Sequence, residues 1–231
     1  MAKKQYFLIV DTETTMASTV ADFAGIICDR KGEIFNQIAV LVRGEFGSKK
    51  LFYDVNSEHE IWTLKGLKRR NENYKNMLNT GQRMMASPLA INKWLAQAKN
   101  SYPNLIFTAY NSSFDLDKMA KTGIDTEFKN SFCLMRAAQN KVKGNKKYIQ
   151  HCLDRKWLTL KLNFRTNAEA MAEFTLGGAL PSEPHTALED ILDYELPIFK
   201  WLLKNGVSYK SLDQTGYNWR DWQLNQLVIP K

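Results

Sequence analysis

The sequence has few cysteines and no long apolar run, and each of these features excludes a class of protein. It also has no internal repeat. The three cysteines are Cys28, Cys133 and Cys152, which are widely spaced and odd in number. They provide neither a disulfide framework nor a C-x-x-C metal knuckle, as expected for a reducing cytoplasm. No apolar run approaches the ~18 residues of a membrane-spanning helix, and the run before Asp11 is too short for a signal peptide. We therefore expect a soluble, cytoplasmic protein with no membrane partner.

The sequence also has fewer acidic than basic side chains. The sequence contains 24 Asp and Glu against 32 Lys and Arg, which gives a formal net charge of +8. This balance favours a polyanionic partner such as nucleic acid, although an anionic membrane surface or a need for solubility would give a similar composition. The 231 residues, 44% of them hydrophobic, are enough for one large α/β domain with a substantial core, or for two small ones.

Five apolar segments are expected to form the strands of one sheet. They are residues 6–10, 23–28, 34–42, 105–110 and 131–134. The segments 6–10 and 105–110 are continuously apolar, so we expect them to be buried in the middle of the sheet. Turn-forming residues 29–33 join the second and third segments, which predicts that the first three strands form an antiparallel meander.

The pattern along the rest of the chain indicates one main domain over residues 1–204. Residues 44–87 contain helical segments but too few apolar residues for a separate core, so we interpret them as an α-rich insertion. Residues 111–113 are good helix caps after the second central strand, and a late helix is expected to begin near residues 184–185. Residues 205–231 are rich in Tyr and Trp, which predicts a C-terminal extension packed on the domain.

Acidic residues stand at the ends of several of these elements. Asp11 and Glu13 close the first strand, and because side chains at i and i+2 point the same way, both carboxylates should face one cleft. Two like charges held this close raise each other's pKa unless a cation lies between them, and a divalent metal takes oxygen ligands. Asp115 begins a helix, while His185 and Asp190 open the late helix. Each residue alone has an ordinary explanation as a helix-end or solvated side chain, whereas their joint occurrence indicates a site.

Together these segments resemble the DEDDh family of 3′→5′ exonucleases, also called DnaQ-like, within the RNase H-like superfamily. The matching motifs are Asp11-x-Glu13, Asn111-x-x-Phe114-Asp115 and His185-x-Ala187-x-x-Asp190. They span residues 11–190, which is most of the chain. The resemblance implies an α/β, RNase H-like fold, with a mixed five-stranded sheet of an antiparallel meander plus parallel strands, flanked by helices.

The resemblance also implies a role for each motif residue. Asp11, Glu13, Asp115 and Asp190 would bind two divalent metal ions, Mg²⁺ or Mn²⁺, and would be catalytic together with His185. The imidazole would act as general base toward the attacking water, because its ordinary pKa lies near neutral pH.

Two neighbouring acids compete with these ligands on sequence grounds. On a helix, Glu189 lies four residues from His185 and on the same side, so helical geometry alone favours it over Asp190. Asp117, two residues after Asp115, is a similar neighbouring candidate. The family pattern places the ligands at Asp115 and Asp190, and we interpret Glu189 and Asp117 as structural or solvent-facing acids.

The implied activity is metal-dependent hydrolysis of phosphodiester bonds from a free 3′ end of nucleic acid, releasing nucleoside 5′-monophosphates. Single-stranded DNA is the expected substrate, with DNA favoured over RNA, and the expected substrate contacts are Thr14, Met16, Asn111 and Phe114. The alternatives are an RNA-trimming exoribonuclease of the same family, an internally cutting nuclease, and a non-catalytic nucleic-acid-binding protein on the same fold. The basic segments 65–70 and 141–147 would either contact phosphates or form solvated faces. The sequence does not indicate the oligomeric state.

Overall fold

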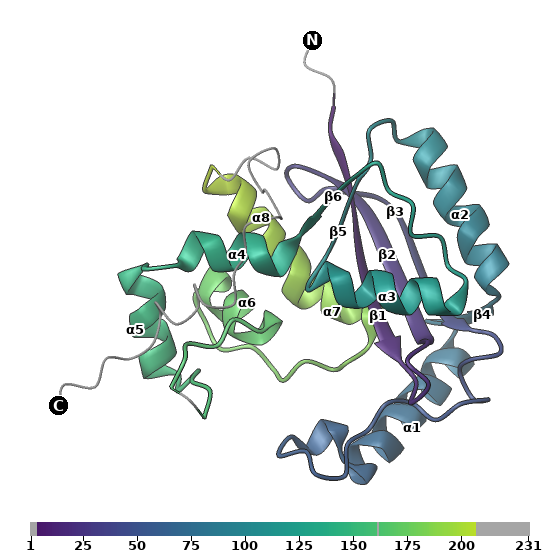
Figure 1. Cartoon of the computed structure of the whole chain (residues 1–231), viewed down its shortest axis with the longest axis horizontal. Coiled ribbons are helices and arrows are strands. Elements are labelled where there is room, and N and C mark those ends of the chain that lie inside the picture. Colours follow the sequence, from purple (N-terminus) through teal and green to yellow (C-terminus); the bar gives the residue numbers. More distant parts are fainter. Residues whose placement is uncertain (1–3, 161, 207–231) are drawn as a thin grey trace.

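The computed structural model describes residues 4–160 and 162–206, and within these ranges six strands form one mixed sheet of order β4-β3-β2-β1-β5-β6 (Figure 1). The strands are β1 (Tyr6–Thr14), β2 (Val20–Asp29), β3 (Ile34–Val42), β4 (Met84–Ala86), β5 (Ile106–Ala109) and β6 (Asn130–Cys133). β1, β2 and β3 pair antiparallel, whereas β5 pairs parallel to β1, and β6 pairs parallel to β5. The expected mixed sheet with an antiparallel meander is confirmed.

The predicted number of five strands is wrong, because β4 adds a sixth strand parallel to β3 at the edge of the sheet. Only three residues long, β4 lies within the segment that we expected to be α-rich. Its sequence, Met-Met-Ala, has no alternation of apolar and polar residues that would distinguish it from a loop.

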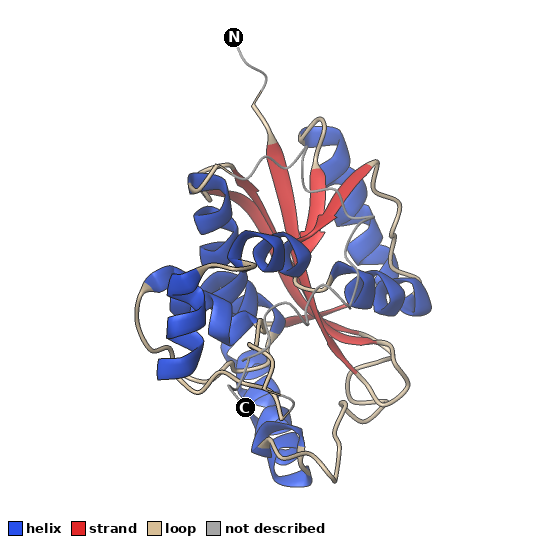
Figure 2. Cartoon of the chain, turned by 60° about the vertical axis from the view of Figure 1, so that its left-hand side comes forward, coloured by secondary structure: helices blue, strands red, loops and turns tan. Residues whose placement is uncertain are grey.

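Helices cover both faces of the sheet (Figure 2). They are η1 (Glu60–Trp62), α1 (Leu64–Thr80), α2 (Pro88–Ser101), α3 (Ser112–Thr122), α4 (Leu134–Val142), α5 (Lys146–Asp154), α6 (Ala168–Leu176), α7 (Ala187–Asp190), η2 (Ile191–Glu195) and α8 (Leu196–Lys204). The basic segment 65–70 therefore belongs to α1, and 141–147 covers the end of α4 and the start of α5. Within the described ranges, no helix combines the length and apolar content needed to cross a membrane.

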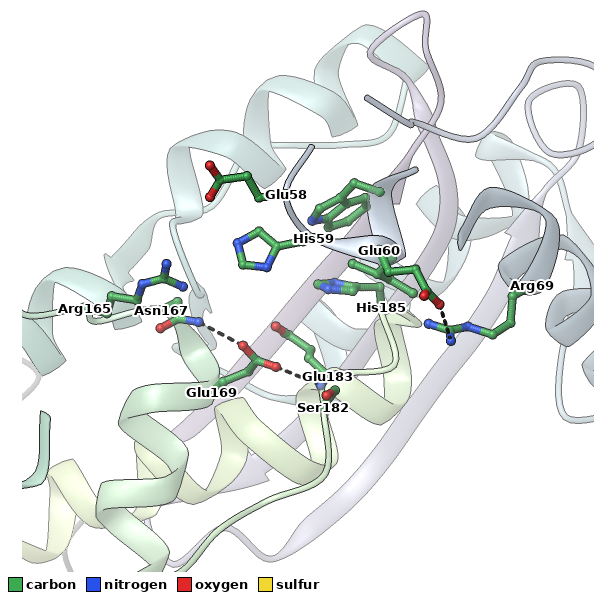
Figure 3. Close-up of a pocket in the computed structure, with 12 residues that line it drawn as sticks. Glu58, His59, Glu60, Arg69, Arg165, Asn167, Glu169, Ser182, Glu183 and His185 are labelled. Carbon is green, nitrogen blue, oxygen red and sulfur yellow. Dashed lines mark hydrogen bonds and ion pairs between the residues drawn. The ribbon is translucent and has the colours of Figure 1, made fainter. Parts of the chain in front are cut away.

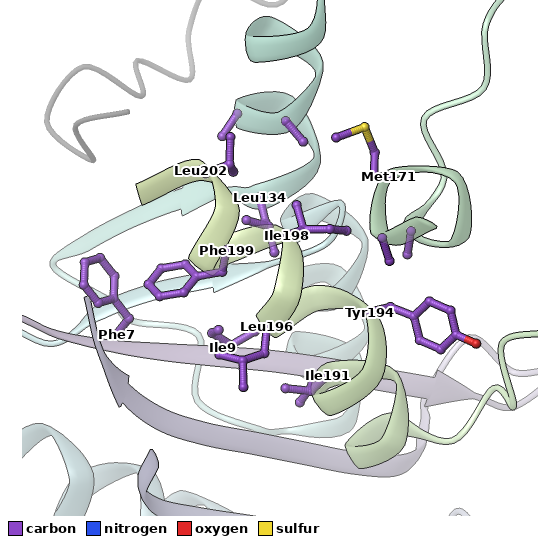
Figure 4. Close-up of a cluster of buried hydrophobic side chains, with 14 of the residues drawn as sticks. Phe7, Ile9, Leu134, Met171, Ile191, Tyr194, Leu196, Ile198, Phe199 and Leu202 are labelled. Atoms are coloured by element: carbon purple, nitrogen blue, oxygen red, sulfur yellow. The ribbon is translucent and has the colours of Figure 1, made fainter. Parts of the chain in front are cut away.

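Alternation along β1 divides the core into two layers. Phe7 and Ile9 face a cluster formed with α4, α6 and α8, and Figure 4 shows their side chains beside Ile191 and Phe199. The side chain of Leu8, and those of the residues two positions before and after it on β1, point to the opposite face of the sheet, where α2 and α3 pack. Because side chains alternate, the odd-numbered positions that follow Ile9 on β1 point toward the layer that contains α7. This places Asp11 and Glu13 on the side of the late helix.

Residues 44–87, which we interpret as an insertion, pack where β2 begins and β3 ends. Tyr74 and Met77 from α1 form a small buried cluster with Ala21, Leu41 and Leu51. In Figure 1, α1 lies at the end of the sheet away from the N-terminus. Of the expected extension 205–231, everything after residue 206 lies outside the described residues.

Candidate functional site

A cleft of about 370 Å³ opens at the end of β1. Its lining includes all five predicted catalytic residues together with two predicted substrate contacts: Asp11, Glu13, Asp115, His185, Asp190, Thr14 and Phe114. The lining residues that the sequence did not indicate include Phe52, Trp62 and Glu183. Met16 and Asn111, the remaining predicted substrate contacts, are not among the lining residues.

The two carboxylates of β1 meet the late helix because α7 packs on β1 and β2. Glu13, His185 and Asp190 offer ligand atoms that all lie within 4.8 Å of one another. The Nδ1 atom of His185 is 3.8 Å from Oε1 of Glu13. Buried oxygens of Asp11 (Oδ2) and Asp190 (Oδ1) accept no hydrogen bond from any residue in the described part of the chain. These oxygens are therefore available to a ligand.

Asp115 enters the cleft from the first turn of α3 and is 1% exposed. The Oγ1 atom of Thr12 donates a 2.8 Å hydrogen bond to Oδ1 of Asp115, which ties the helix start to β1. Asn111 is the N-cap residue of α3, within the predicted capping segment 111–113, but its side chain donates or accepts no capping hydrogen bond. Asn111 adopts a left-handed conformation with φ of 73°, and its carbonyl oxygen accepts a 2.8 Å hydrogen bond from the N–H of Phe114. Asn is one of the few residues with a side chain that tolerates this conformation.

Burial dominates the electrostatics of these carboxylates. Burial, together with the charge of Asp22, raises the pKa of Asp11 to about 7. Burial likewise raises the pKa values of Glu13 and Asp115, and the charge of Asp11 raises both further. The pKa of Asp190 also lies well above its ordinary value, because of burial and then the charge of Glu183. These acids are thus poised to gain from a bound cation.

Arg83 resolves the choice between Glu189 and Asp190 in physical terms. Its Nη2 atom lies 2.5 Å from Oε2 of Glu189, and its Nε atom lies 3.1 Å from Oδ1 of Asp22. The backbone N–H of Ala187 also donates to Asp22, at 3.0 Å. Burial acts to raise the pKa of Glu189, but its hydrogen bonds from Arg83 leave the value below the ordinary range. Glu189 is thus held in an ion pair with Arg83, whereas Asp190 lines the cleft.

Asp117, the acid that competes with Asp115, is held outside the cleft. Its carboxylate pairs with Lys118 at 2.9 Å and with Lys121 at 2.8 Å on the exposed side of α3. Hydrogen bonds from these two lysines lower the pKa of Asp117.

His185 does not lie on a helix, so the expectation that the late helix begins near residues 184–185 is wrong. It precedes α7 in a left-handed conformation, with φ of 54°, and the helical relation to Glu189 does not exist. A non-glycine residue in this region is uncommon and carries backbone strain of roughly 1–3 kcal/mol. Burial, together with the charges of Arg70 and His59, lowers the pKa of the His185 imidazole to about 4, below the near-neutral value expected from the sequence. The imidazole is therefore neutral at pH 7.

Sequence reasoning also missed Glu195, which does not line the cleft but interacts electrostatically with Asp11 and Asp115. Its Oε1 atom accepts a 3.3 Å hydrogen bond from the N–H of Tyr110, and the residue is 2% exposed. Burial raises its pKa, and Asp11 and Asp115 raise it further. Glu195 ends η2, a π-helical turn, in which residues five apart come to lie nearly above one another. The only sequence signal for such a turn is Pro197, which disrupts regular helix before it.

A second opening, of about 480 Å³, adjoins the cleft and shares Trp62, Glu183 and His185 with it. Figure 3 shows Glu183 between His185 and Glu169 in this opening. Glu169 is held by hydrogen bonds from Asn167 at 3.1 Å and from the N–H of Glu183 at 3.1 Å. Burial, followed by the charge of Asp11, raises the pKa of Glu183 to about 8.

Comparisons with known proteins add little to this geometry. No family model matches the sequence, and no curated protein matches it. Among solved structures, the chain is similar to "Exonuclease X in complex with 5′ overhanging duplex DNA", at 15% sequence identity and a TM-score of 0.39. The similarity covers 94% of this chain and 96% of that chain. A TM-score of this size establishes neither a shared fold nor a shared activity, so the function is inferred from the residues of the cleft.

Proposed function

We propose that this protein is a metal-dependent 3′→5′ exonuclease that releases nucleoside 5′-monophosphates from single-stranded DNA. The proposal follows the DEDDh pattern of the sequence. One observation carries it: four carboxylates from β1, α3 and α7 converge with a neutral histidine in one cleft. In the sequence these residues are spread from Asp11 to Asp190, so their convergence is a property of the fold.

The residues of the cleft fit divalent cations. Asp11 and Asp190 each have a buried oxygen to which no described residue donates a hydrogen bond, and oxygen donors suit Mg²⁺ or Mn²⁺ better than zinc. Asp11, Glu13, Asp115 and Asp190 would hold two such ions, because four negative charges offset those of two divalent cations. When bound, the ions lower the pKa of the attacking water and stabilise the leaving oxygen.

His185 supplies the proton acceptor in this proposal. Its imidazole is neutral at pH 7 because burial lowers its pKa to about 4, so a ring nitrogen is free to accept a proton from the attacking water. Glu13, whose Oε1 lies 3.8 Å from Nδ1 of His185, would stabilise the imidazolium formed by that transfer.

Exposed aromatic rings at the rim of the cleft suit the bases at a strand end. Phe114 is 41% exposed and Phe52 is 40% exposed, and both line the cleft. Stacking on such rings holds single-stranded bases without sequence preference. Lys118 lies 4.9 Å from the Phe114 ring and lines the same cleft, where its charge would attract a phosphate. Thr14, which lines the cleft, and Met16 and Asn111, which do not, remain proposed substrate contacts.

A matched set of oligonucleotides tests the proposal. The purified full-length chain is incubated with 5′-labelled linear DNA and RNA, single- and double-stranded, and with circular single-stranded DNA, each with Mg²⁺, Mn²⁺ or EDTA. We expect progressive shortening of linear single-stranded DNA from its 3′ end with Mg²⁺ or Mn²⁺, nucleoside 5′-monophosphate products, and no reaction with EDTA. Cleavage of the circle would instead indicate an internally cutting nuclease, and preferential shortening of RNA an exoribonuclease. Unchanged activity in Asp11→Ala or His185→Ala would refute the mechanism.

A further inference from the structure

The insertion between β3 and β4 contacts the histidine of the cleft at two separate places. The indole of Trp62, at the end of η1, lies against the imidazole of His185, with ring centroids 4.3 Å apart and an interplanar angle of 47°. The hydroxyl of Tyr74, in α1, donates a 3.3 Å hydrogen bond to the carbonyl oxygen of His185. Both the side chain and the backbone of His185 therefore depend on residues far away in the sequence.

Trp62 is itself held in place by its neighbours within the insertion. The guanidinium carbon of Arg70 lies 4.7 Å from the centre of the Trp62 ring, and Arg70 also donates a hydrogen bond to the carbonyl oxygen of Phe52. The ring of Phe52 meets the Trp62 ring edge-on, at 5.7 Å. The N–H of Asp54 donates to the Trp62 carbonyl oxygen at 2.7 Å. The indole consequently forms a fixed surface for the imidazole to rest on.

His185 needs such a surface because its own segment supplies little support. Residues 179–186 form no regular secondary structure, and His185 adopts the left-handed conformation just before α7. Its imidazole approaches Glu13 through Nδ1, at 3.8 Å, which is longer than a hydrogen bond. Proton transfer requires a ring nitrogen to stay within about 2.6–3.2 Å of the group that loses the proton. A ring that rotates freely would spend much of its time outside that range.

We propose that Trp62 is a positioning residue that holds the His185 imidazole in the orientation required for proton transfer. The catalytic part of this inference rests on the proposed function, whereas the packing part does not. An insertion that is remote in sequence thereby becomes part of the site. A role for Trp62 in stability alone would lower the melting temperature of its variants but leave the turnover of the folded fraction unchanged.

Kinetics of the full-length chain separate the two roles. We expect Trp62→Ala to lower kcat about 10-fold, less than the ~10²–10⁴-fold expected for loss of the base itself, with little change in KM. Trp62→Phe keeps an aromatic ring and should recover most of kcat. The matched control is Trp94→Ala, because Trp94 is also partly buried but packs in the layer on the opposite face of the sheet. Its kcat should equal that of the unsubstituted chain at temperatures where both are folded.

A second measurement needs no activity. The sequence contains three histidines, so NMR can resolve their imidazole resonances separately. The resonances that disappear in the variant His185→Gln are those of His185. The ring current of Trp62 should shift the His185 resonances, and Trp62→Ala should remove that shift while Trp94→Ala leaves it. An unchanged His185 resonance in Trp62→Ala, or an unchanged kcat at equal folded fraction, would overturn the proposal. If the unsubstituted chain degrades no nucleic acid, the proposed function fails, and the NMR result alone decides whether Trp62 holds His185.

Discussion

Two groups of carboxylates lie side by side where β1, β2 and α7 meet, and they differ in how their charge is offset. Asp22 and Glu189 share the guanidinium of Arg83, whose side chain is fully buried. Glu13 is opposite Asp22 in the strand register, and Asp190 follows Glu189 in the chain. Among the described residues, no Lys or Arg forms an ion pair with Glu13 or Asp190.

The difference separates acids that hold the fold from acids that are available to a ligand. Arg83, which directly precedes β4, binds Asp22 of β2 and Glu189 of α7. The N–H of Ala187, also in α7, donates a further hydrogen bond to Asp22. This network fixes the helix that carries Asp190 against the sheet. Buried charge without a partner destabilises a fold, so the four-carboxylate cluster of Asp11, Glu13, Asp115 and Asp190 lowers stability until a cation binds.

The largest effect is expected when one acid of the four-carboxylate cluster loses its charge. Asp190→Asn keeps the shape of the side chain but removes a ligand, and we expect activity to fall by at least about 10³-fold, since metal ions supply several kcal/mol of transition-state stabilisation. Glu189→Gln is the matched control and should keep most of its activity at temperatures where it is folded. The assay is Mg²⁺-dependent shortening of single-stranded DNA. Equal losses in both variants would erase the distinction between the two groups.

Arg83→Met should have the next largest effect, on stability. Removing the cation leaves Asp22 buried without its partner, which typically lowers the free energy of unfolding by about 3–5 kcal/mol. Urea unfolding in EDTA measures the change. The double variant Arg83→Met/Asp22→Asn should recover part of the loss because the unpaired charge is then also removed. A single variant as stable as the parent chain would mean that the network does not support the fold.

A smaller effect is expected from pH in the absence of metal. The pKa of Asp11 is raised from 3.8 to about 7, so its protonated form is favoured in the folded chain. The corresponding stability is present below pH 4 and is lost as pH rises toward 7. Glu13, Asp115 and Asp190 act in the same direction, whereas His185, whose pKa is lowered, acts in the opposite one. We therefore expect the melting temperature in EDTA to fall between pH 4.5 and pH 7.

Mg²⁺ should reduce this decline, because a bound cation favours the ionised carboxylates. Asp190→Asn in EDTA should show a shallower decline than the parent chain, since one of the titrating groups is absent. A melting temperature that rises over the same pH range, with the same slope in both proteins, would contradict the account of the cluster.

The smallest effect is expected at Asp117. This acid is exposed and paired with Lys118 and Lys121, and exposed ion pairs contribute little to stability. Asp117→Asn should therefore leave the melting temperature, Mg²⁺ affinity and activity of the chain nearly unchanged. A loss of activity comparable with that of an Asp115→Asn variant would show that Asp117 has a role in the cleft.

The parts of the fold that follow from local pattern were predictable from sequence. The strand at residues 6–10 and the helix that begins at Pro88 are examples. A continuous apolar run predicts a buried strand, and a cap residue followed by Pro predicts a helix start, so both follow from residues adjacent in the sequence. The Oγ atom of Ser87 accepts from the N–H of Ala90 at 3.2 Å, as such a cap should. The acids were predictable for a related reason, since each stands at the end of an element.

The remaining features depend on contacts between distant residues. Glu189 could be distinguished from Asp190 by geometry only once Arg83, 106 positions earlier, was placed beside it. The left-handed conformation of His185 and the π-helical turn before Pro197 are set by tertiary packing, which overrides helical periodicity. The contact of Trp62 with His185 likewise has no local signal, because the insertion shows no pattern that relates it to the motifs.

The central claim is that the four-carboxylate cluster binds divalent metal whereas the acids paired with Arg83 do not. Isothermal titration of the full-length chain with Mn²⁺ tests it most directly, with Asp190→Asn and Glu189→Gln compared at pH 7.5. We predict two bound ions for the parent chain and for Glu189→Gln, and loss of at least one ion or a large drop in affinity for Asp190→Asn. No Mn²⁺ binding by the folded parent chain, or identical binding by all three proteins, would contradict the account.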